Sequence, residues 1–225
     1  MRKKMFWVGL LFSSIQSFAQ TYSSDSIGGH TYVDLGLASG TLWATCNVGA
    51  ERPEEYGGYF AWGETTQKDS CNWDRYALSN GGPANLTKYC TDDFFGVSDG
   101  RTTLLPEDDA ATANWGPGWR MPTYKEMQEL LNGCIWVWTD NYAGTGISGR
   151  MGTSITTGQV IFLPAAGYKG AGRFSSVGDY GEYWSSSLDS SSSDSALDIS
   201  FVSGNFNAYG NSRYNGQSVR AVVAK

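Results

Sequence analysis

The sequence predicts an α+β domain in which short antiparallel sheets, one or two helices and long ordered loops share one core. The composition favours short strands over a helical bundle, because 29 Gly and 13 Tyr are spread among short apolar runs. The clearest helical pattern lies at 124–133, and strand-like runs crowd toward the C-terminus. A chain of 225 residues is long enough for one such domain with a sizeable core.

Residues 1–19 follow the layout of a secretory signal peptide. Three basic residues precede an apolar run over 5–12, and Ser17 and Ala19 supply the small residues of a cleavage site. The apolar run is too short to span a bilayer. We therefore expect a short N-terminal segment at 20–27, followed by the domain at 28–225.

The charge balance narrows the range of partners. Three of the 16 basic residues and none of the 22 acidic residues lie in the signal segment, so the rest of the chain has a net charge of −9. An acidic domain without a basic stripe argues against nucleic acid and anionic lipid as partners. No later run approaches 18 consecutive apolar residues, so no transmembrane segment is expected. These features predict an exported protein in the periplasm, at the cell surface or outside the cell.

Local patterns predict the elements of the first half. Residues 30–36 and 41–49 alternate well enough to form the first strands. Region 52–109 lacks regular patterns, but its interleaved aromatic residues predict a packed, ordered loop. A short turn of helix is expected at 107–115.

The helix at 124–133 has signals at both ends. Thr123 is a favourable N-cap, Glu126 completes a capping box, and Gly133 ends the helix. The strand-like runs that follow lie at 134–139, 160–168, 183–187, 196–202, 206–209 and 218–224. Because the first and last strand-like runs of the domain lie at its opposite ends, we expect these two strands to pair and close it.

The chain has four cysteines: Cys46, Cys71, Cys90 and Cys134. An even number in an exported chain suggests two disulfides, for which three pairings exist. The apolar, Trp-rich surroundings of Cys46 and Cys134 favour Cys46–Cys134, which leaves Cys71–Cys90. Four free buried thiols are the alternative, because a domain of this size does not need covalent staples. No CxxC pair occurs and His30 is the sole histidine, which argues against zinc.

The run from Ser185 to Ser195 contains eight serines in eleven residues and leads into a predicted β-hairpin. Over 196–202 apolar side chains alternate with small or polar ones, which predicts one face toward the core and one polar face. Residues 203–205 supply the turn, and the return strand begins at Phe206. The polar face, the serine run and residues 210–217 would then form one continuous surface.

We predict that this surface binds a ligand. Asn, Ser, Tyr and Gly are the residues of adaptable binding loops, and a rigid hairpin is a suitable support for them. The alternative is a solvated serine loop without function. The predicted ligand-binding residues are Ser187, Asp189, Ser191, Ser193, Asp198, Ser200, Asn205, Asn207, Tyr209, Asn211, Arg213 and Tyr214.

Seven motifs, taken in order, resemble the Fibrobacter succinogenes major paralogous domain family. They are WATCNVGA, YGGYFAWGET, DDAATANWG, WRMPTYKEMQELLNGC, IFLPAAGY, YWSSS and SVRAV, and the match covers roughly residues 28–225. The resemblance implies a C-type lectin-like fold of the formylglycine-generating-enzyme type, in which the N- and C-terminal strands pair.

The resemblance also implies a binding role. Some similar proteins are variable proteins of diversity-generating retroelements, in which adenine-directed mutagenesis changes surface residues near the C-terminus. The expected products include Asn, Ser, Asp, Tyr, Gly and Ala, much like the composition of 185–217. The EPN, QPD and WND motifs of calcium-dependent sugar binding are missing, and the paired-Cys copper site of the related oxidase does not carry over, because all four cysteines precede residue 135.

Catalytic motifs are sparse. His30 has no Ser or Cys motif around it, which argues against a His-based triad, and no GxxxxGK[ST] phosphate loop occurs. A glycosidase needs two carboxylates facing one cleft, and the sequence leaves a chance pair open. Asp108 and Asp109 are expected to cap a helical turn, with a structural Ca²⁺ site formed with the loop Asp92–Asp99 as the alternative.

Six tryptophans at motif positions are expected in the core: Trp43, Trp62, Trp115, Trp119, Trp136 and Trp138. Trp184 is expected beneath the polar surface, and Arg220 is expected to form a structural hydrogen-bond fork. The sequence thus predicts an exported, non-enzymatic domain that needs no cofactor and binds a protein or glycan ligand. The alternatives are a carbohydrate-active or calcium-dependent sugar-binding domain, and a structural envelope protein without a discrete ligand.

Overall fold

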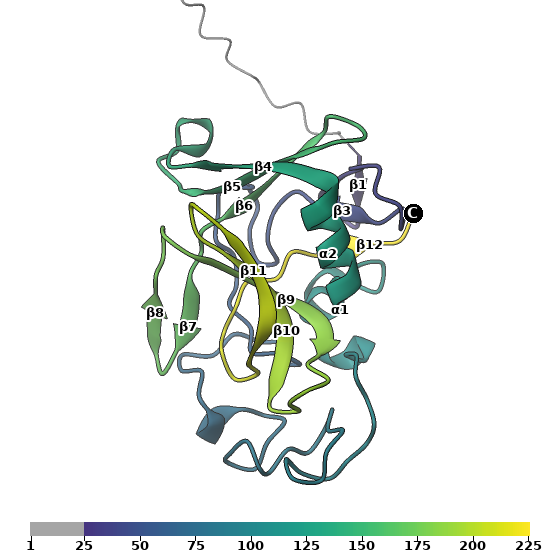
Figure 1. Cartoon of the computed structure of the whole chain (residues 1–225), viewed down its shortest axis with the longest axis vertical. Helices are drawn as coiled ribbons and strands as arrows, with labels where there is room; N and C mark the ends of the chain where they lie inside the picture. The colour runs from purple at the N-terminus through teal and green to yellow at the C-terminus, as the bar shows by residue number, and fades with distance from the viewer. Residues whose placement is uncertain (1–24) are drawn as a thin grey trace, which may run out of the picture.

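The computed structural model describes residues 25–225, which contain twelve short strands and two α-helices joined by turns and long loops. The strands form four small antiparallel sheets, which confirms the expected α+β class. Figure 1 shows the sheets and helix α2 in the upper and middle parts of the molecule, with long loops below them. The predicted signal peptide lies outside the described residues. Within 25–225, no helix has the length and apolar character needed to cross a membrane.

Both ends of the described chain enter one sheet. Its strands, in the order β1-β2-β3-β12, are β1 (Ser26–Ile27), β2 (His30–Val33), β3 (Leu42–Ala44) and β12 (Val222–Val223). The last strand was expected to pair with the run at 30–36, which contains β2. This expectation is wrong, because β12 pairs instead with β3, with Val222 opposite Trp43.

The buried side chain of Arg220 explains why β12 pairs with β3. Its guanidinium donates hydrogen bonds to the carbonyls of Ala44 and Thr45 and to Asn47 Oδ1, at distances of 2.9–3.2 Å. These bonds hold the chain before β12 against the end of β3. The predicted structural fork at Arg220 is confirmed.

Helix α2 (Tyr124–Gly133) begins and ends where its sequence signals predict. The Thr123 side chain accepts a hydrogen bond from the Glu126 backbone, and the Glu126 side chain accepts one from the Thr123 backbone, which completes the capping box. Met127 and Leu130 are fully buried and anchor the helix in the core.

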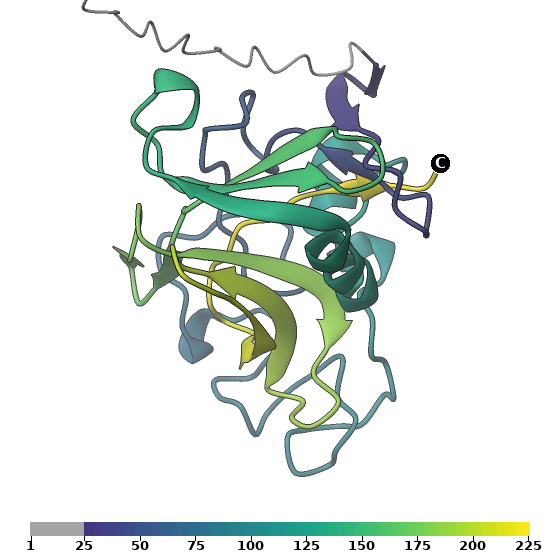
Figure 2. The ribbon, with the colours of Figure 1, turned by 45° about the horizontal axis from the view of Figure 1, so that its top comes forward.

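Two three-stranded sheets lie on either side of α2, which Figure 2 shows nearly end-on. The strands of the first are β4 (Cys134–Thr139), β5 (Gly149–Ser154) and β6 (Val160–Pro164). The strands of the second are β9 (Gly181–Leu188), β10 (Ser195–Phe201) and β11 (Phe206–Ser212), with β10 in the middle. The hairpin of β10 and β11 has the predicted turn, with Ser200 opposite Asn207.

A short hairpin of β7 (Tyr168–Gly170) and β8 (Arg173–Ser175) projects from the body at the left of Figure 1. Gly167 allows the chain to enter it. Its φ is +62°, and a Cβ there would lie 2.1 Å from the Ser175 carbonyl oxygen, so no other residue fits.

The region 52–109 is a packed loop, as predicted, with 3₁₀ turns η1 (Trp73–Arg75) and η2 (Pro106–Asp108). Most of its aromatic side chains pack inward, although Phe94 is exposed, and the rings of Trp62 and Tyr89 meet edge-on at 5.2 Å between centroids. The short helix α1 (Ala110–Trp115) follows, and Asp109 caps it by accepting a hydrogen bond from Thr112 N.

Four of the seven tryptophans expected inside the domain are buried there, and the other three are only partly buried. The almost completely buried ones are Trp43, Trp62, Trp119 and Trp184. Those that pack against the core from partly exposed positions are Trp115, Trp136 and Trp138. His30 stacks on Trp115, with ring centroids 3.9 Å apart, so this histidine has a packing role.

The four cysteines are free, so the predicted disulfides Cys46–Cys134 and Cys71–Cys90 are not formed. All four thiols are buried, and no two of them are joined. The thiols of Cys46 and Cys90 donate to nearby backbone carbonyls at 3.3 and 3.1 Å, and Cys134 packs in the apolar cluster that contains α2. The alternative of four free buried thiols is the one that the structure supports.

Candidate functional site

On β10, the predicted polar face of the β10–β11 hairpin is covered. Asp198 and Ser200 on β10 are fully buried, and Gln217 donates a hydrogen bond from Nε2 to Asp198 Oδ2 at 2.8 Å. Ser193 in the serine run is also buried, against Thr91. The expectation that Ser193, Asp198 and Ser200 lie on an exposed surface is wrong, because the C-terminal segment and the long loop cover them.

Arg213 departs furthest from expectation. Its guanidinium is fully buried and donates hydrogen bonds at 2.9–3.0 Å to the carbonyls of Lys88, Tyr89 and Ser193 and to the Tyr76 hydroxyl. The side chain ties the long loop to the C-terminal segment. A ligand-facing Arg213 is therefore excluded in this structure.

The other eight predicted binding residues are at least partly exposed: Ser187, Asp189, Ser191, Asn205, Asn207, Tyr209, Asn211 and Tyr214. They do not form one continuous surface. Asn211 and Tyr214 line a large open pocket, whereas Ser191 lines a smaller, separate one. Asn205 and Asn207 lie at the turn of the β10–β11 hairpin.

The large pocket, which we call the η1–β11 pocket, has a volume of about 780 Å³. It is bounded by η1, the β7–β8 hairpin, β11 and the segment after β11. Its aromatic lining residues are Trp73, Tyr168, Tyr180 and Tyr214. The rings of Trp73 and Tyr214 lie 5.1 Å apart between centroids, so these two form one wall.

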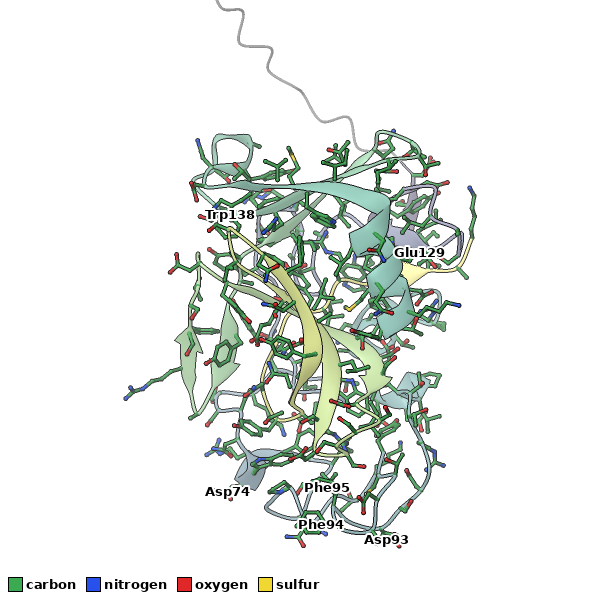
Figure 3. The ribbon with its side chains drawn as sticks, in the orientation of Figure 1. Asp74, Asp93, Phe94, Phe95, Glu129 and Trp138 are labelled. Atoms are coloured by element: carbon green, nitrogen blue, oxygen red, sulfur yellow. The ribbon has the colours of Figure 1, made fainter. Side chains whose placement is uncertain are left out.

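Polar groups complete the lining of the η1–β11 pocket. The uncharged ones are Asn72, Ser175, Ser176, Asn211 and Asn215. The carboxylates are Asp74, which Figure 3 labels on η1, and Glu182. Among the described residues that line the pocket there is no lysine or arginine. The pocket is therefore electronegative.

Glu182 on β9 and Asp198 on β10 form a buried pair at the inner side of the pocket. The Asn211 side-chain nitrogen donates to Glu182 Oε1 and to Asp198 Oδ2, each at 3.3 Å. Glu182 is 5% exposed and Asp198 is fully buried. Three other buried oxygens, Glu182 Oε2, Asp198 Oδ1 and Gln217 Oε1, have no hydrogen-bond partner among residues 25–225.

This arrangement raises the pKa of both acids. Burial, followed by the negative charge of Asp198, raises the pKa of Glu182 to about 8, against the opposing effect of the Asn211 hydrogen bond. Burial raises the pKa of Asp198 to about 7, although Gln217 and Asn211 donate to it. Near neutral pH the pair therefore shares on the order of one proton.

The serine run borders the second pocket, of about 400 Å³, together with Thr91, Asp92, Asp93 and Ser98. Here the acidic loop makes internal contacts. Asp99 accepts hydrogen bonds from Tyr89 N and Cys90 N and pairs with Arg101. Over the described residues, no group of three His, Cys, Asp or Glu side chains is suited to a metal.

Sequence patterns did not single out Glu182 as a site residue. A signal was present in GEYWSSS, where an acidic residue stands within a strand of mostly apolar and small residues. A carboxylate in a buried strand needs a partner or a function. That Glu182 lies next to Asp198 can be seen only in the structure, where strands β9 and β10 pair.

Comparisons of the chain with protein-family models, with curated proteins and with solved structures found no match.

Proposed function

We propose that this chain is an exported, non-enzymatic recognition domain that binds its ligand in the η1–β11 pocket. The observation that carries the proposal is Glu182, a buried carboxylate that lines an aromatic pocket with one oxygen unpartnered among the described residues. Buried polar atoms are almost always hydrogen-bonded, so an exception at a pocket points to a ligand. The exported location rests on the layout of residues 1–19.

The framework of this proposal is a C-type lectin-like fold of the major paralogous domain type. Its support is the sheet that joins β2, β3 and β12, the two helices and the long packed loop. On such a framework the core fixes the strands, and the loops around the pocket carry specificity.

Retroelement-type diversification is a further part of the proposal, and the structure limits where it could act. Tyr209 and Tyr214 are partly exposed and could vary without loss of the fold, whereas Asn211 donates to both buried acids and is constrained. Arg213 and Asp198 are buried and hydrogen-bonded, and they could not. Sequencing the gene across closely related isolates tests this, because substitutions at template adenines should spare the buried positions.

Ligand screening tests the site itself. The full exported chain should be screened on glycan and peptide arrays beside two single variants, Ser175→Trp, which fills the η1–β11 pocket, and Ser191→Trp, which fills the serine pocket. We expect Ser175→Trp to abolish capture and Ser191→Trp to retain it. Capture that survives Ser175→Trp, or no capture by the folded wild-type chain, would contradict the proposal and favour a structural envelope role.

A second candidate is a carbohydrate-active enzyme. The observation in its favour is that Glu182 lines the pocket with a pKa raised to about 8, a property of general acids. The second carboxylate of the lining is Asp74. Turnover of aryl glycosides that is lost in both Glu182→Gln and Asp74→Asn would establish this function over simple binding.

A further inference from the structure

The η1–β11 pocket presents negative charge without a counter-charge. Asp74 and Glu182 line it, and Asp198 lies directly behind Glu182. Lys169, which stands between the lining residues Tyr168 and Gly170 on β7, is engaged elsewhere and donates from Nζ to the Lys68 carbonyl at 2.6 Å. Arg213 is fully buried on loop carbonyls. Among residues 25–225, no lysine or arginine forms an ion pair with Glu182 or Asp198.

Three of the unpartnered buried atoms in and behind the pocket are carboxylate or amide oxygens, which accept hydrogen bonds, whereas the nearby unpartnered hydroxyls of Ser200 and Ser218 can donate as well as accept. Glu182 Oε2, Asp198 Oδ1 and Gln217 Oε1 lack donors among the described residues, while the available amide groups of Asn211 and Gln217 already donate to the pair. A ligand that supplied more acceptors would leave these oxygens unsatisfied. A ligand that supplied N–H donors and positive charge would satisfy Glu182 and offset the charge of the pair.

The walls suit a cation as well. The faces of Trp and Tyr rings attract cations, and Trp73, Tyr168, Tyr180 and Tyr214 line the same pocket as Glu182. An ammonium group on an alkyl chain would place its charge at Glu182 and its methylene groups against the rings.

We propose that the η1–β11 pocket selects ligands that carry a primary ammonium group, which donates hydrogen bonds to Glu182. This proposal rests on the proposed function, since it names the ligand chemistry of the same pocket. The class includes lysine side chains and amino sugars, because both present an ammonium group on a carbon framework.

Binding of the ammonium group is coupled to a proton. The acid pair of Glu182 and Asp198 holds a proton near neutral pH, and the incoming cation displaces it to solvent. The other titratable groups that face the pair are Tyr180, whose pKa burial raises to about 12, and Asp74 at the rim. An alkylammonium stays charged to about pH 10. Affinity should therefore rise by up to about tenfold per pH unit between about pH 6 and 8 and then level off.

The test titrates n-butylammonium chloride into the full chain at constant ionic strength, followed by amide chemical shifts of Asn211, Asn215 and Tyr180. The neutral isostere n-butanol is the matched ligand control. Glu182→Gln is the test variant, and the exposed Glu107→Gln is the matched protein control. We expect n-butylammonium to bind at least tenfold more tightly than n-butanol, Glu182→Gln to lose that difference, and Glu107→Gln to keep it.

Three results of this titration would overturn the proposal. One is equal binding of n-butanol and n-butylammonium. Another is full retention of amine binding in a folded Glu182→Gln chain. The third is reproduction of the same shifts by NaCl or KCl alone, which would assign the site to an inorganic cation. If Glu182→Gln fails to fold, the affinity of the wild-type chain for n-butylammonium at several pH values tests the proposal instead, and an affinity that does not rise between about pH 6 and 8 would overturn the coupling to a proton. A neutral ligand captured in the array screen and lost in Ser175→Trp would overturn this proposal while the proposed function stands.

Discussion

Glu182 and Asp198 share one hydrogen-bond donor, the Asn211 side-chain nitrogen, which lies 3.3 Å from a carboxylate oxygen of each. One amide cannot compensate two buried negative charges, and among residues 25–225 Asp198 has only Gln217 as a further side-chain donor. The pair is therefore stable in the fold mainly while it retains a proton. This links the stability of the domain to the chemistry of its pocket.

The first prediction concerns stability and pH. Folding raises the pKa of Glu182 to about 8 and that of Asp198 to about 7, so the folded chain binds more protons than the unfolded chain between about pH 4 and 8. The free energy of unfolding should fall as pH rises through this range, by on the order of a few kcal/mol. Thermal unfolding at several pH values measures this. In Glu182→Gln the slope should be shallower, and an unchanged slope would count against the pair.

The second prediction concerns Arg213. Its removal leaves the carbonyls of Tyr89 and Ser193 without their donor and takes a cation from the face of Trp62, 4.8 Å from the ring centroid. Arg213→Ala should lower the free energy of unfolding by about 3–5 kcal/mol. Arg213→Lys should recover little of it, because one ammonium cannot replace the fork. Arg173→Ala, at an exposed position, is the control in urea unfolding, and equal effects of the two alanine variants would contradict the assignment.

The third prediction concerns the start of α2. Glu126 accepts hydrogen bonds from Thr123 N, from Arg120 at 2.5 and 2.8 Å, and from Thr41 at 3.0 Å. Glu126→Ala should cost about 2 kcal/mol in urea unfolding. Because these contacts, despite partial burial, lower the pKa of Glu126 to about 2, its contribution should be lost as pH falls from about 4.5 toward 2. Gln128→Ala, at an exposed position on the same helix, should change stability by less than about 0.5 kcal/mol.

The fourth prediction concerns the thiols. Burial raises the pKa of Cys134 to about 11 and also raises those of Cys46 and Cys71, so the native chain should react slowly with a thiol reagent at neutral pH. After unfolding without reductant, four thiols per chain should react. A count of two or none would restore one or both of the predicted disulfides.

The sequence predicted elements whose signals are local. Thr123 and Glu126 lie three residues apart, and the hairpin of β10 and β11 follows from alternation around a three-residue turn. Strand β5 escaped prediction because its sequence, GRMGTS, has neither alternation nor β-branched residues at its start. Its position depends on Gly152, where a Cβ would lie 2.7 Å from the Trp136 ring of the neighbouring strand.

The site depended on long-range packing and was predicted less well. Arg213 stands in a Gly- and Asn-rich segment that reads as surface loop, yet its partners Lys88 and Tyr89 lie in the long loop far away in the chain. Asn211 was expected as a binding residue and does line the pocket. Its contact with Glu182 could not be read from the sequence, because it requires the pairing of three strands.

The most direct measurement is a ¹³C NMR titration of the side-chain carboxyl groups of Glu182 and Asp198 in the wild-type chain, with Glu182→Gln used for assignment. We predict that the pair titrates with apparent pKa values near 7 and 8, and that saturating n-butylammonium moves the upper one down. Titration of both carboxyl groups near pH 4, with no change when the amine is added, would contradict the account. Such pKa values would mean that water already stabilises both negative charges, so the pair would need neither a proton nor a bound cation.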